Sequence, residues 1–208
     1  MRVHKWAGLG VVGLAGLVFA GHVLAANDLT PKKHFKIVNP SRLNEAEALS
    51  VYDNVRERMM RGYARSADRT SKRYLRWQRL NGFPYPSATH GNRYVNNYAN
   101  AFAKGYGQLK PGQKVPAGSI IAKDSFTVTQ NRSVFPGALF IMEKLKKGAR
   151  PETGDWRYRM IMPDGSFFGD SEGDGADKVA FCAGCHKTVS ETDYLFQVPE
   201  KYRRILLK

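Results

Sequence analysis

The sequence predicts an α+β protein with an antiparallel β-sheet of about five strands, N-terminal helices, and a short C-terminal segment that contains both cysteines of the chain. Two patterns support this fold class. Apolar residues recur at helical spacing between residues 43 and 82, and from Arg93 onward strand-like apolar runs are separated by turn signals. With 208 residues, of which 42% are hydrophobic and 25% charged, the chain is long enough for one folded domain with its own core.

The first 25 residues have the organisation of a secretory signal peptide. The basic start "MRVHK" precedes the apolar run "WAGLGVVGLAGLVFA", and Val23-Leu24-Ala25 forms a small-residue cleavage site. The apolar run is shorter than the roughly 20 residues that a bilayer-spanning helix needs, and no second hydrophobic segment follows it. We therefore expect residues 1–25 to be removed and the rest of the chain to be exported to the periplasm.

The chain is strongly basic. Its formal charge is +15, and loss of Arg2 and Lys5 with the signal peptide leaves +13. Because the chain is expected outside the cytoplasm, we expect no nucleic-acid partner. An acidic redox protein or anionic lipid headgroups would complement this surface, and a basic surface without a specific partner is the alternative.

Residues 26–87 are expected to form a basic helical region. Asn44 is suited to cap a first helix, because acidic residues follow it in the first turn. A second helix is expected over residues 69–82, where it ends at Gly82 ahead of two prolines. The apolar positions at helical spacing in the first helix are Leu49, Tyr52, Val55, Met59 and Tyr63.

The strands are expected in the second half of the chain. Residues 93–98, 118–129 and 137–145 have strand-like composition, and residues 155–170 are expected to form a hairpin around a Pro-Asp-Gly turn. A short helical piece is expected over residues 99–107. Side chains alternate between the two faces of a strand, but the pattern does not determine which face of the second run is buried. One face of that run carries Ile121, Lys123 and Ser125, and the other Ala122, Asp124 and Phe126.

The two cysteines lie in the motif Cys182-Ala183-Gly184-Cys185-His186, after a Gly- and Asp-rich linker at residues 169–178. C-x-x-C-H is the pattern of c-type haem attachment, in which two thiols bond to the haem vinyl groups and the histidine ligates the iron. A structural zinc site needs four ligands, and a thioredoxin-like pair lies beside a βαβ unit, so both are poor matches. A disulfide or a free dithiol is the remaining alternative. We expect one covalently attached haem c per chain, with Cys182 and Cys185 as attachment points and His186 as metal ligand.

The function of such a haem depends on the sixth position of the iron, because a second strong ligand gives an electron carrier and an open position permits gas or substrate chemistry. The small cytochromes c are mostly helical, with the haem motif near the N-terminus. Here the motif lies near the C-terminus, after a predicted sheet, which indicates another haem fold. The residues that offer a second ligand outside the signal peptide are His34, His90, Met59, Met60, Met142, Met160 and Met162.

Five stretches, taken in order over residues 88–200, resemble the cytochrome P-460 family, which includes the related β-type cytochrome c-prime. They are "HGNRYVNNY", "VPAGSIIAKDSF", "GALFIMEKL", "GDWRYRMIMPDG" and "CAGCHKTVSETDYLF". The last is the most specific, since family members often follow the haem motif with a T-D-x-x-F element, here Thr192, Asp193 and Phe196. The resemblance implies a haem domain at residues 88–208, preceded by a region that it does not cover.

The resemblance also implies roles for individual residues. In cytochromes P-460 a lysine is covalently linked to the haem macrocycle, and Lys123 in "GSIIAKDS" occupies the matching position. Arg93 falls where the family places a pocket arginine. The hydroxylamine-oxidising members also have a distal carboxylate that can accept protons. Here an ungapped match places Phe140 at that position, whereas Glu143 requires a gap and points to the opposite face of the strand.

The leading hypothesis is an exported mono-haem cytochrome that oxidises hydroxylamine at a five-coordinate iron and passes the electrons to an acceptor. Arg93 and Glu143 would steer protons, and the acceptor would be an acidic redox protein. The first alternative is a nitric oxide binding protein without turnover, in which Phe140, Phe126 or Met142 forms an apolar distal wall. The second is a plain electron-transfer cytochrome. The resemblance also implies a homodimer.

Overall fold

The computed structural model describes Met1, Ile37 and residues 39–204. The expected signal peptide, apart from Met1, and the candidate ligand His34 lie outside the described residues. The two α-helices of the described part are α1 (Glu45–Tyr63) and α2 (Ala176–His186). Short 3₁₀ turns connect the other elements, at η1 (Thr70–Lys72), η2 (Tyr74–Arg76), η3 (Ala88–His90), η4 (Ala101–Ala103), η5 (Tyr106–Gln108), η6 (Pro151–Thr153), η7 (Lys187–Thr192) and η8 (Glu200–Tyr202).

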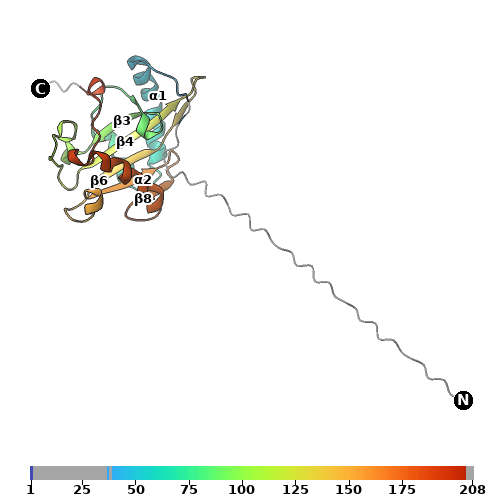
Figure 1. Cartoon of the computed structure of the whole chain (residues 1–208). Coiled ribbons are helices and arrows are strands. Elements are labelled where there is room, and N and C mark those ends of the chain that lie inside the picture. Colours follow the sequence, from blue (N-terminus) through green and yellow to red (C-terminus); the bar gives the residue numbers. More distant parts are fainter. Residues whose placement is uncertain (2–36, 38, 205–208) are drawn as a thin grey trace.

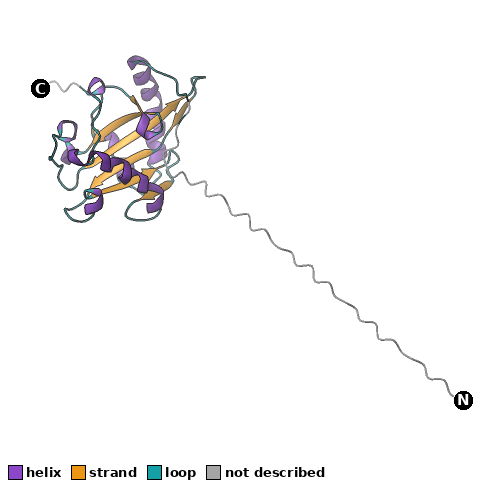
Figure 2. Cartoon of the chain, in the orientation of Figure 1, coloured by secondary structure: helices purple, strands orange, loops and turns teal. Residues whose placement is uncertain are grey.

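The centre of the molecule is one antiparallel sheet, in which eight strands are described (Figures 1 and 2). The main path is β1-β3-β4-β6-β7-β8, with β2 paired to β3 and β5 paired to β4. The strands are β1 (Gln78–Arg79), β2 (Tyr85–Ser87), β3 (Arg93–Ala99), β4 (Ile120–Val128), β5 (Val134–Pro136), β6 (Leu139–Lys144), β7 (Trp156–Ile161) and β8 (Phe167–Asp170). Every pairing is antiparallel, which confirms the predicted α+β class.

The expected number of about five strands is too low. The five longer strands, β3, β4, β6, β7 and β8, are the ones that the sequence pattern indicates. The additional strands β1, β2 and β5 contain two or three residues each. A run this short cannot show the alternation of apolar and polar residues that marks a strand in a sequence.

Helix α1 packs against one face of the sheet and begins at the expected cap. The side chain of Asn44 accepts a hydrogen bond from the Glu47 backbone N–H, and the Glu47 carboxylate accepts one from the Asn44 N–H, both at 2.9 Å. This capping box satisfies two backbone donors of the first turn. The helix residues buried against the sheet are Ala48, Tyr52, Val55, Met59 and Tyr63. No helix in the described part of the chain is long and apolar enough to cross a membrane.

The second helix expected over residues 69–82 does not form. Two 3₁₀ turns and strand β1 occupy this segment. Asp68 accepts hydrogen bonds from the backbone N–H groups of Thr70 and Ser71, and the Ser71 hydroxyl donates to the Asp68 carbonyl. Such local bonds compete with an α-helix. The pairing of β1 with β3 then holds the end of the segment in extended conformation, a long-range contact that helical spacing alone does not reveal.

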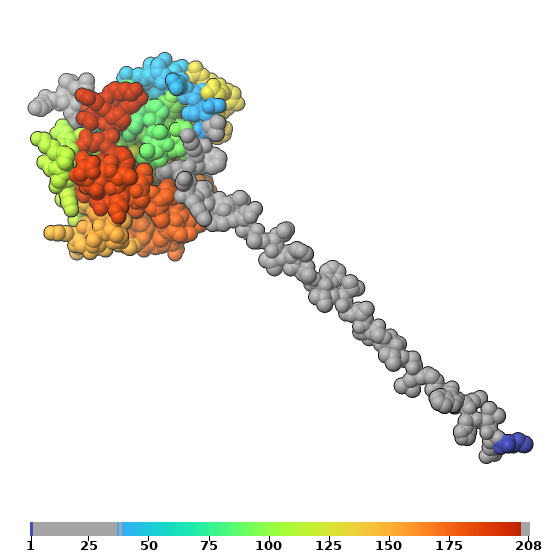
Figure 3. Space-filling view, in the orientation of Figure 1, coloured from blue at the N-terminus to red at the C-terminus, as the bar shows by residue number. Residues whose placement is uncertain are grey.

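The sheet is covered on both faces. Side chains of α1 and of one sheet face form one apolar cluster, and the other face packs with the C-terminal segment that contains α2. In Figure 1, α2 crosses the sheet in front and α1 lies behind it, and in Figure 3 the C-terminal segment (red) covers the middle of the front face. Strand β4 is therefore buried on both sides. Ala122 and Phe126 belong to the α1 side, and Ile121 belongs to the α2 side.

The α1 side contains a buried carboxylate. Asp124 is fully buried and accepts hydrogen bonds from the hydroxyls of Tyr52 (2.6 Å) and Tyr74 (3.2 Å) and from the side-chain amide of Asn96 (3.0 Å). The Tyr52 hydroxyl also contacts that of Tyr98. Burial is the main influence on this carboxyl and raises its pKa from 3.8 to about 6, although the three donors oppose the change.

Asp124→Asn should change how stability depends on pH. The folded-state pKa of Asp124 lies above the unfolded one. Below about pH 4 the carboxyl is protonated in both states and does not lower the free energy of unfolding. Between about pH 4 and pH 6 the unfolded state loses the proton more readily, and the free energy of unfolding falls by on the order of 3 kcal/mol. The variant should lose this decline in the free energy of unfolding, measured by denaturant titration at pH 4 to 7. Exposed Asp174→Asn is the matched control and should retain the wild-type slope. If the free energy of unfolding depended on pH equally in Asp124→Asn and wild type, the raised pKa of Asp124 would be contradicted.

Candidate functional site

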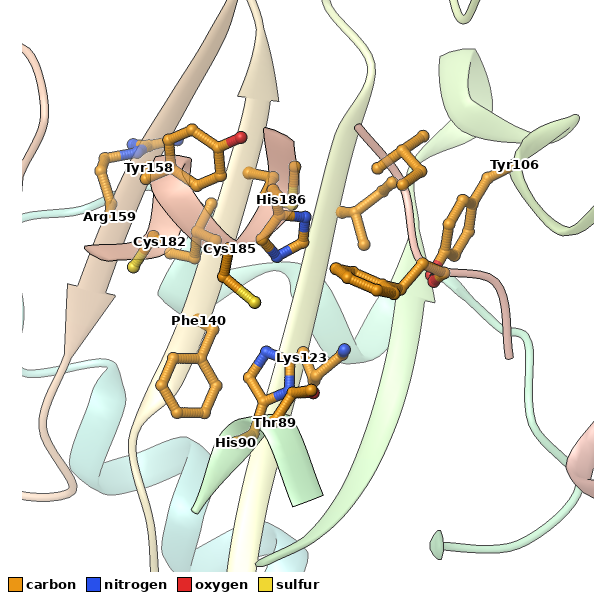
Figure 4. A pocket seen from close by; sticks show the side chains of 15 residues that line it. Thr89, His90, Tyr106, Lys123, Phe140, Tyr158, Arg159, Cys182, Cys185 and His186 are labelled. Atoms are coloured by element: carbon orange, nitrogen blue, oxygen red, sulfur yellow. The ribbon is translucent and has the colours of Figure 1, made fainter. Parts of the chain in front are cut away.

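A cavity lies on the α2 side of the sheet, where the cysteine motif faces strands β4, β6 and β7. Cys182, Cys185 and His186 line it from α2, and Lys123 lines it from β4. Figure 4 shows these side chains around a common space, with Phe140 and His90 on its lower side. The C-x-x-C-H motif near the C-terminus and Lys123 from the middle of the chain therefore line the same cavity.

Both cysteines lie in the last turns of α2, three residues apart on the same side of the helix. They are unpaired in the structure. Burial, and secondarily the neighbouring Cys185, raises the pKa of the Cys182 thiol to about 12. This group therefore stays a neutral thiol at neutral pH, unlike the low-pKa thiolates of redox-active or metal-binding cysteines. In the described ranges no group of three or more His, Cys, Asp or Glu side chains could hold a metal ion, so a zinc site gains no support.

The imidazole of His186 is oriented by a backbone carbonyl. Its Nδ1 lies 2.7 Å from the Tyr194 carbonyl oxygen, and since a carbonyl can only accept, Nδ1 carries the proton. The other ring nitrogen, Nε2, is then the one that can ligate a metal, an arrangement typical of histidine ligands with a fixed tautomer. The ring of Phe196 packs edge-on against the imidazole at 5.3 Å between centroids.

The segment after the motif is fixed by a buried ion pair. Asp193 is fully buried, and its carboxylate pairs with the ammonium of buried Lys144 on β6 and accepts the Val115 backbone N–H at 3.0 Å. The Asp193 carbonyl accepts the indole N–H of Trp156 at 2.8 Å. Asp193 and Tyr194 both adopt positive φ, 56° and 63°, conformations that cost energy in L-residues and need such support. The T-D-x-x-F element therefore positions the carbonyl that orients His186.

Lys123 is enclosed in the cavity. It is 9% exposed. Burial lowers its pKa from 10.5 to about 8, opposed by the nearby Cys185. Its neighbour Asp124 cannot compensate the charge, because alternation along β4 directs that carboxylate to the α1 side.

Two of the three residues proposed for an apolar distal wall line the cavity. Phe140 and Met142 do so from β6, next to each other on the same strand face. Phe126 does not, because it is buried on the α1 side, where its ring stacks with Tyr52 and Tyr94. The assignment of Phe126 to the distal wall is therefore wrong.

Arg93 and Glu143 are not among the residues that line the cavity. Arg93 starts β3 and its guanidinium donates to the His90 carbonyl at 3.3 Å, so it lies close to the cavity wall. Glu143 is on the α1 face of β6, where it pairs with Arg159 at 2.7 Å. Strand alternation separates it from Phe140, so it cannot serve as the distal carboxylate. No Asp or Glu lines this cavity among the residues that the structure describes.

The fold places several of the candidates for a second iron ligand away from the cavity. Met59 is buried in the α1 core, and Met60, Met160 and Met162 do not line the cavity. Of the described candidates, His90 and Met142 remain next to it.

Sequence reasoning did not identify Tyr106 and Tyr158 as cavity residues. The Tyr106 hydroxyl donates to the Phe196 carbonyl and accepts from Asn97, and so belongs to the wall. The Tyr158 hydroxyl is buried without a partner in the described part of the chain, and its ring lies 5.5 Å from that of His186. An unsatisfied buried hydroxyl and the buried amine of Lys123 both fit a cavity that holds a large bound group with polar substituents. Side chains alternate between the two faces of β7, so Tyr158 lies on the same face as Trp156. This alternation could have identified Tyr158 from the sequence.

A family model described as Cytochrome P460 matches residues 72–197, more than half of the chain. The match includes the cysteine motif, Lys123 and the T-D-x-x-F element. It begins ahead of residue 88, where the haem domain was expected to start. A search of curated proteins gave no match.

Gly154→Ala should disturb the support of His186. A Cβ at Gly154 would lie 2.2 Å from the Tyr194 ring, and the residue has φ +64°. Gly148→Ala is the matched control, because its φ of +84° carries a similar backbone penalty with no atom within 4 Å. In denaturant titrations the control should lose about 1 kcal/mol and Gly154→Ala a further 1–3 kcal/mol or so. The iron–histidine stretching band should also shift in Gly154→Ala alone. Equal losses with unchanged bands would contradict the role of Tyr194.

Proposed function

The chain belongs to the cytochrome P460 family of haem cytochromes, and from this we propose that it is an exported, mono-haem c-type cytochrome that oxidises hydroxylamine at a five-coordinate iron. The observation that carries the proposal is the meeting of the C-x-x-C-H motif and buried Lys123 in one cavity. Oxidation of hydroxylamine releases both electrons and protons, so the protein must supply routes for both.

Three residues of α2 would hold the haem. The thiols of Cys182 and Cys185 would add across its two vinyl groups, with sulfur bonding to one vinyl carbon and the thiol hydrogen to the other, and both residues line the cavity from α2. His186 would ligate the iron through Nε2, since Nδ1 is engaged by the Tyr194 carbonyl. When bound, the haem supplies an iron that accepts electrons from the substrate. The Tyr158 hydroxyl is suited to donate to a polar substituent of the haem.

Lys123 would form a covalent bond to the haem macrocycle. A neutral amine is required for this bond, and burial increases the neutral fraction at a given pH. Replacing one N–H and one C–H bond by a C–N bond releases two protons and two electrons, so an oxidant such as a peroxide must accept the electrons. The residue would then alter the electronic properties of the cofactor during hydroxylamine oxidation.

The second candidate is nitric oxide binding without turnover. Two observations favour it, namely the apolar pair Phe140 and Met142 at the cavity and the position of Glu143 on the other side of the sheet. An electron-transfer cytochrome is the third candidate and would require His90 or Met142 as a sixth ligand.

For the leading function we propose an acidic redox protein as electron acceptor. The net charge of +13 after signal cleavage would attract it at long range, and the association rate should then fall as salt rises. A periplasmic location and a homodimer are further proposals, drawn from the signal-peptide pattern and the family resemblance respectively.

Covalent attachment can be tested by removing the thiols in a Lys123→Met background, where a lysine bond cannot retain the haem. The Lys123→Met protein should keep its haem through denaturing acid extraction, with an intact mass that includes the haem. Adding Cys182→Ala and Cys185→Ala together should release the haem completely, and each alone should leave one thioether. Release of haem from the Lys123→Met parent would contradict c-type attachment.

The lysine bond and the reaction can be tested together. Wild type should show a red-shifted reduced Soret band and a joined Lys123–haem peptide, and its cross-linking by peroxide should be half-maximal near pH 8. Lys123→Met should show an ordinary haem c band and lower hydroxylamine oxidation roughly tenfold or more, about 1.4 kcal/mol in the barrier. Exposed Lys146→Met is the control and should match wild type.

Three results would contradict the leading function. A cross-linked wild type that does not reduce an artificial acceptor with hydroxylamine would place nitric oxide binding first. A free Lys123 peptide with a high-spin haem c spectrum would have the same consequence. A low-spin spectrum would reveal a sixth ligand and an electron carrier.

A further inference from the structure

The positive charge of the chain is concentrated in one stretch. Residues 56–79 contain nine Lys and Arg side chains and two acidic ones, a net charge of +7. They form the second half of α1 and the segment that follows it. Eight of the nine basic residues are exposed. More than half of the +13 expected for the exported chain therefore lies on one part of its surface.

A groove of about 680 Å³ lies within this basic surface, on the α1 side of the sheet. Residues 65–77 form one wall, and the β7–β8 hairpin with Phe167 forms the other. Ile120, Glu143 and Arg157 form the floor. In Figure 1 this side lies behind the sheet, opposite α2. Sites of roughly 300–1,000 Å³ hold drug-sized groups, so this space can take several side chains of a partner.

Five charged residues inside the groove are paired with one another. Arg157 pairs with Asp170, and Arg159 pairs with Asp68 and, at 2.7 Å, with Glu143. These pairs connect the hairpin, the sheet and the segment after α1. A partner would therefore meet a preformed groove, which lowers the ordering cost of binding.

Three further arginines, Arg65, Arg69 and Arg73, line the rim of the groove. All three are exposed, and none takes part in an ion pair found in the described part of the chain. Exposed Phe167 and partly buried Trp77 lie beside them. Arginine and aromatic side chains are enriched among the residues that contribute most to protein–protein binding. Carboxylates on a partner protein would complement this rim.

The groove and the cavity of the cysteine motif lie on opposite faces of the same strands. On each of three strands, one residue lines the cavity and its neighbour lines the groove. These pairs are Ile121 and Ile120 on β4, Met142 and Glu143 on β6, and Tyr158 and Arg157 on β7. Arg159 lines both spaces. The sheet alone therefore separates them, and packed layers lie about 10 Å apart face to face.

We infer that this groove is the docking surface for the acidic electron acceptor. The inference rests on the proposed function and gives its acceptor a location on the molecule. Electron transfer through protein slows steeply with distance, so a partner bound across one sheet layer is well placed. In each transfer the haem loses one electron and the acceptor gains it. A membrane surface fits less well, because it is flat and the rim arginines surround a hollow.

Matched charge reversals test the location. The groove variant carries Arg65→Glu, Arg69→Glu and Arg73→Glu. The control carries Lys104→Glu, Lys110→Glu and Lys146→Glu at exposed positions outside the groove, so both variants lose the same charge. The probe is fluorescent poly-L-glutamate, whose binding to the haem-loaded protein is followed by anisotropy at low salt. The groove variant should bind it about tenfold more weakly than wild type, and the control within about threefold.

A milder variant checks that the loss comes from charge and not from misfolding. Arg65→Gln, Arg69→Gln and Arg73→Gln together should give a loss between those of wild type and the groove variant. Thermal melting and the Soret band should be the same in all of these proteins, because the substituted side chains are exposed and lie outside the cavity.

Electron transfer at the groove can be measured without hydroxylamine. Dithionite-reduced protein is mixed with hexacyanoferrate(III), an anionic acceptor that takes one electron from the haem. Its second-order rate constant should fall about tenfold more in the groove variant than in the control, and poly-L-glutamate should slow the reaction of wild type. If wild type does not oxidise hydroxylamine, the proposed function fails, while this rate and the binding of poly-L-glutamate still test the groove.

Three results would overturn the inference. Equal losses in the groove variant and the control would show that net charge, and not the groove, governs binding. Loss of poly-L-glutamate binding in the groove variant, with a hexacyanoferrate(III) rate equal to that of the control, would remove the electron acceptor as the occupant. Binding of phosphatidylglycerol vesicles through the same three arginines, without binding of poly-L-glutamate, would assign the groove to a membrane surface.

Discussion

The buried ion pair between Lys144 and Asp193 is the contact on which the geometry of the site depends. It joins strand β6 to the irregular segment after α2, and both partners are almost fully enclosed. A buried pair costs desolvation energy, which further hydrogen bonds must offset. Here Val115 donates to Asp193, and the Gly154 carbonyl accepts from Lys144 at 2.8 Å. Two consecutive residues with positive φ are thereby held in place, and the second presents its carbonyl to His186.

Strand alternation decides which residues can reach this site. On β6, Phe140, Met142 and Lys144 face the α2 side. The two residues that line the cavity and the lysine of the buried ion pair therefore come from the same face of the strand. Glu143 lies between them in sequence and faces the opposite side, where Arg159 pairs with it and with Asp68. A carboxylate one residue from a cavity residue is therefore remote from the cavity. Relocating it would require a bulge that shifts the register of β6.

Much of this arrangement could be predicted from the sequence, for a physical reason in each case. The five long strands show alternation over enough residues, and the cysteine motif concentrates its residues in one helical turn. Lys123 was placed by family resemblance, since its strand is buried on both sides and gives no pattern to choose between faces. The prediction of a helix over residues 69–82 was wrong, because the local hydrogen bonds of this segment and its pairing with β3 outweigh helical spacing. The cavity position of His90 depends on a turn between two strands, and no periodicity marks it.

Desolvation shifts the pKa values of two adjacent residues of β4 in opposite directions. It favours the neutral form of each group, which lowers the pKa of Lys123 and raises that of Asp124. The two side chains point to opposite faces, so they cannot form an ion pair that would cancel both effects. A lysine with pKa near 8 has roughly 300 times the neutral fraction at pH 7 of one at 10.5. Burial of the central strand on both faces therefore raises the neutral fraction of the Lys123 amine, the form that the proposed covalent bond requires. Three hydrogen-bond donors on the other face stabilise the buried Asp124 carboxylate.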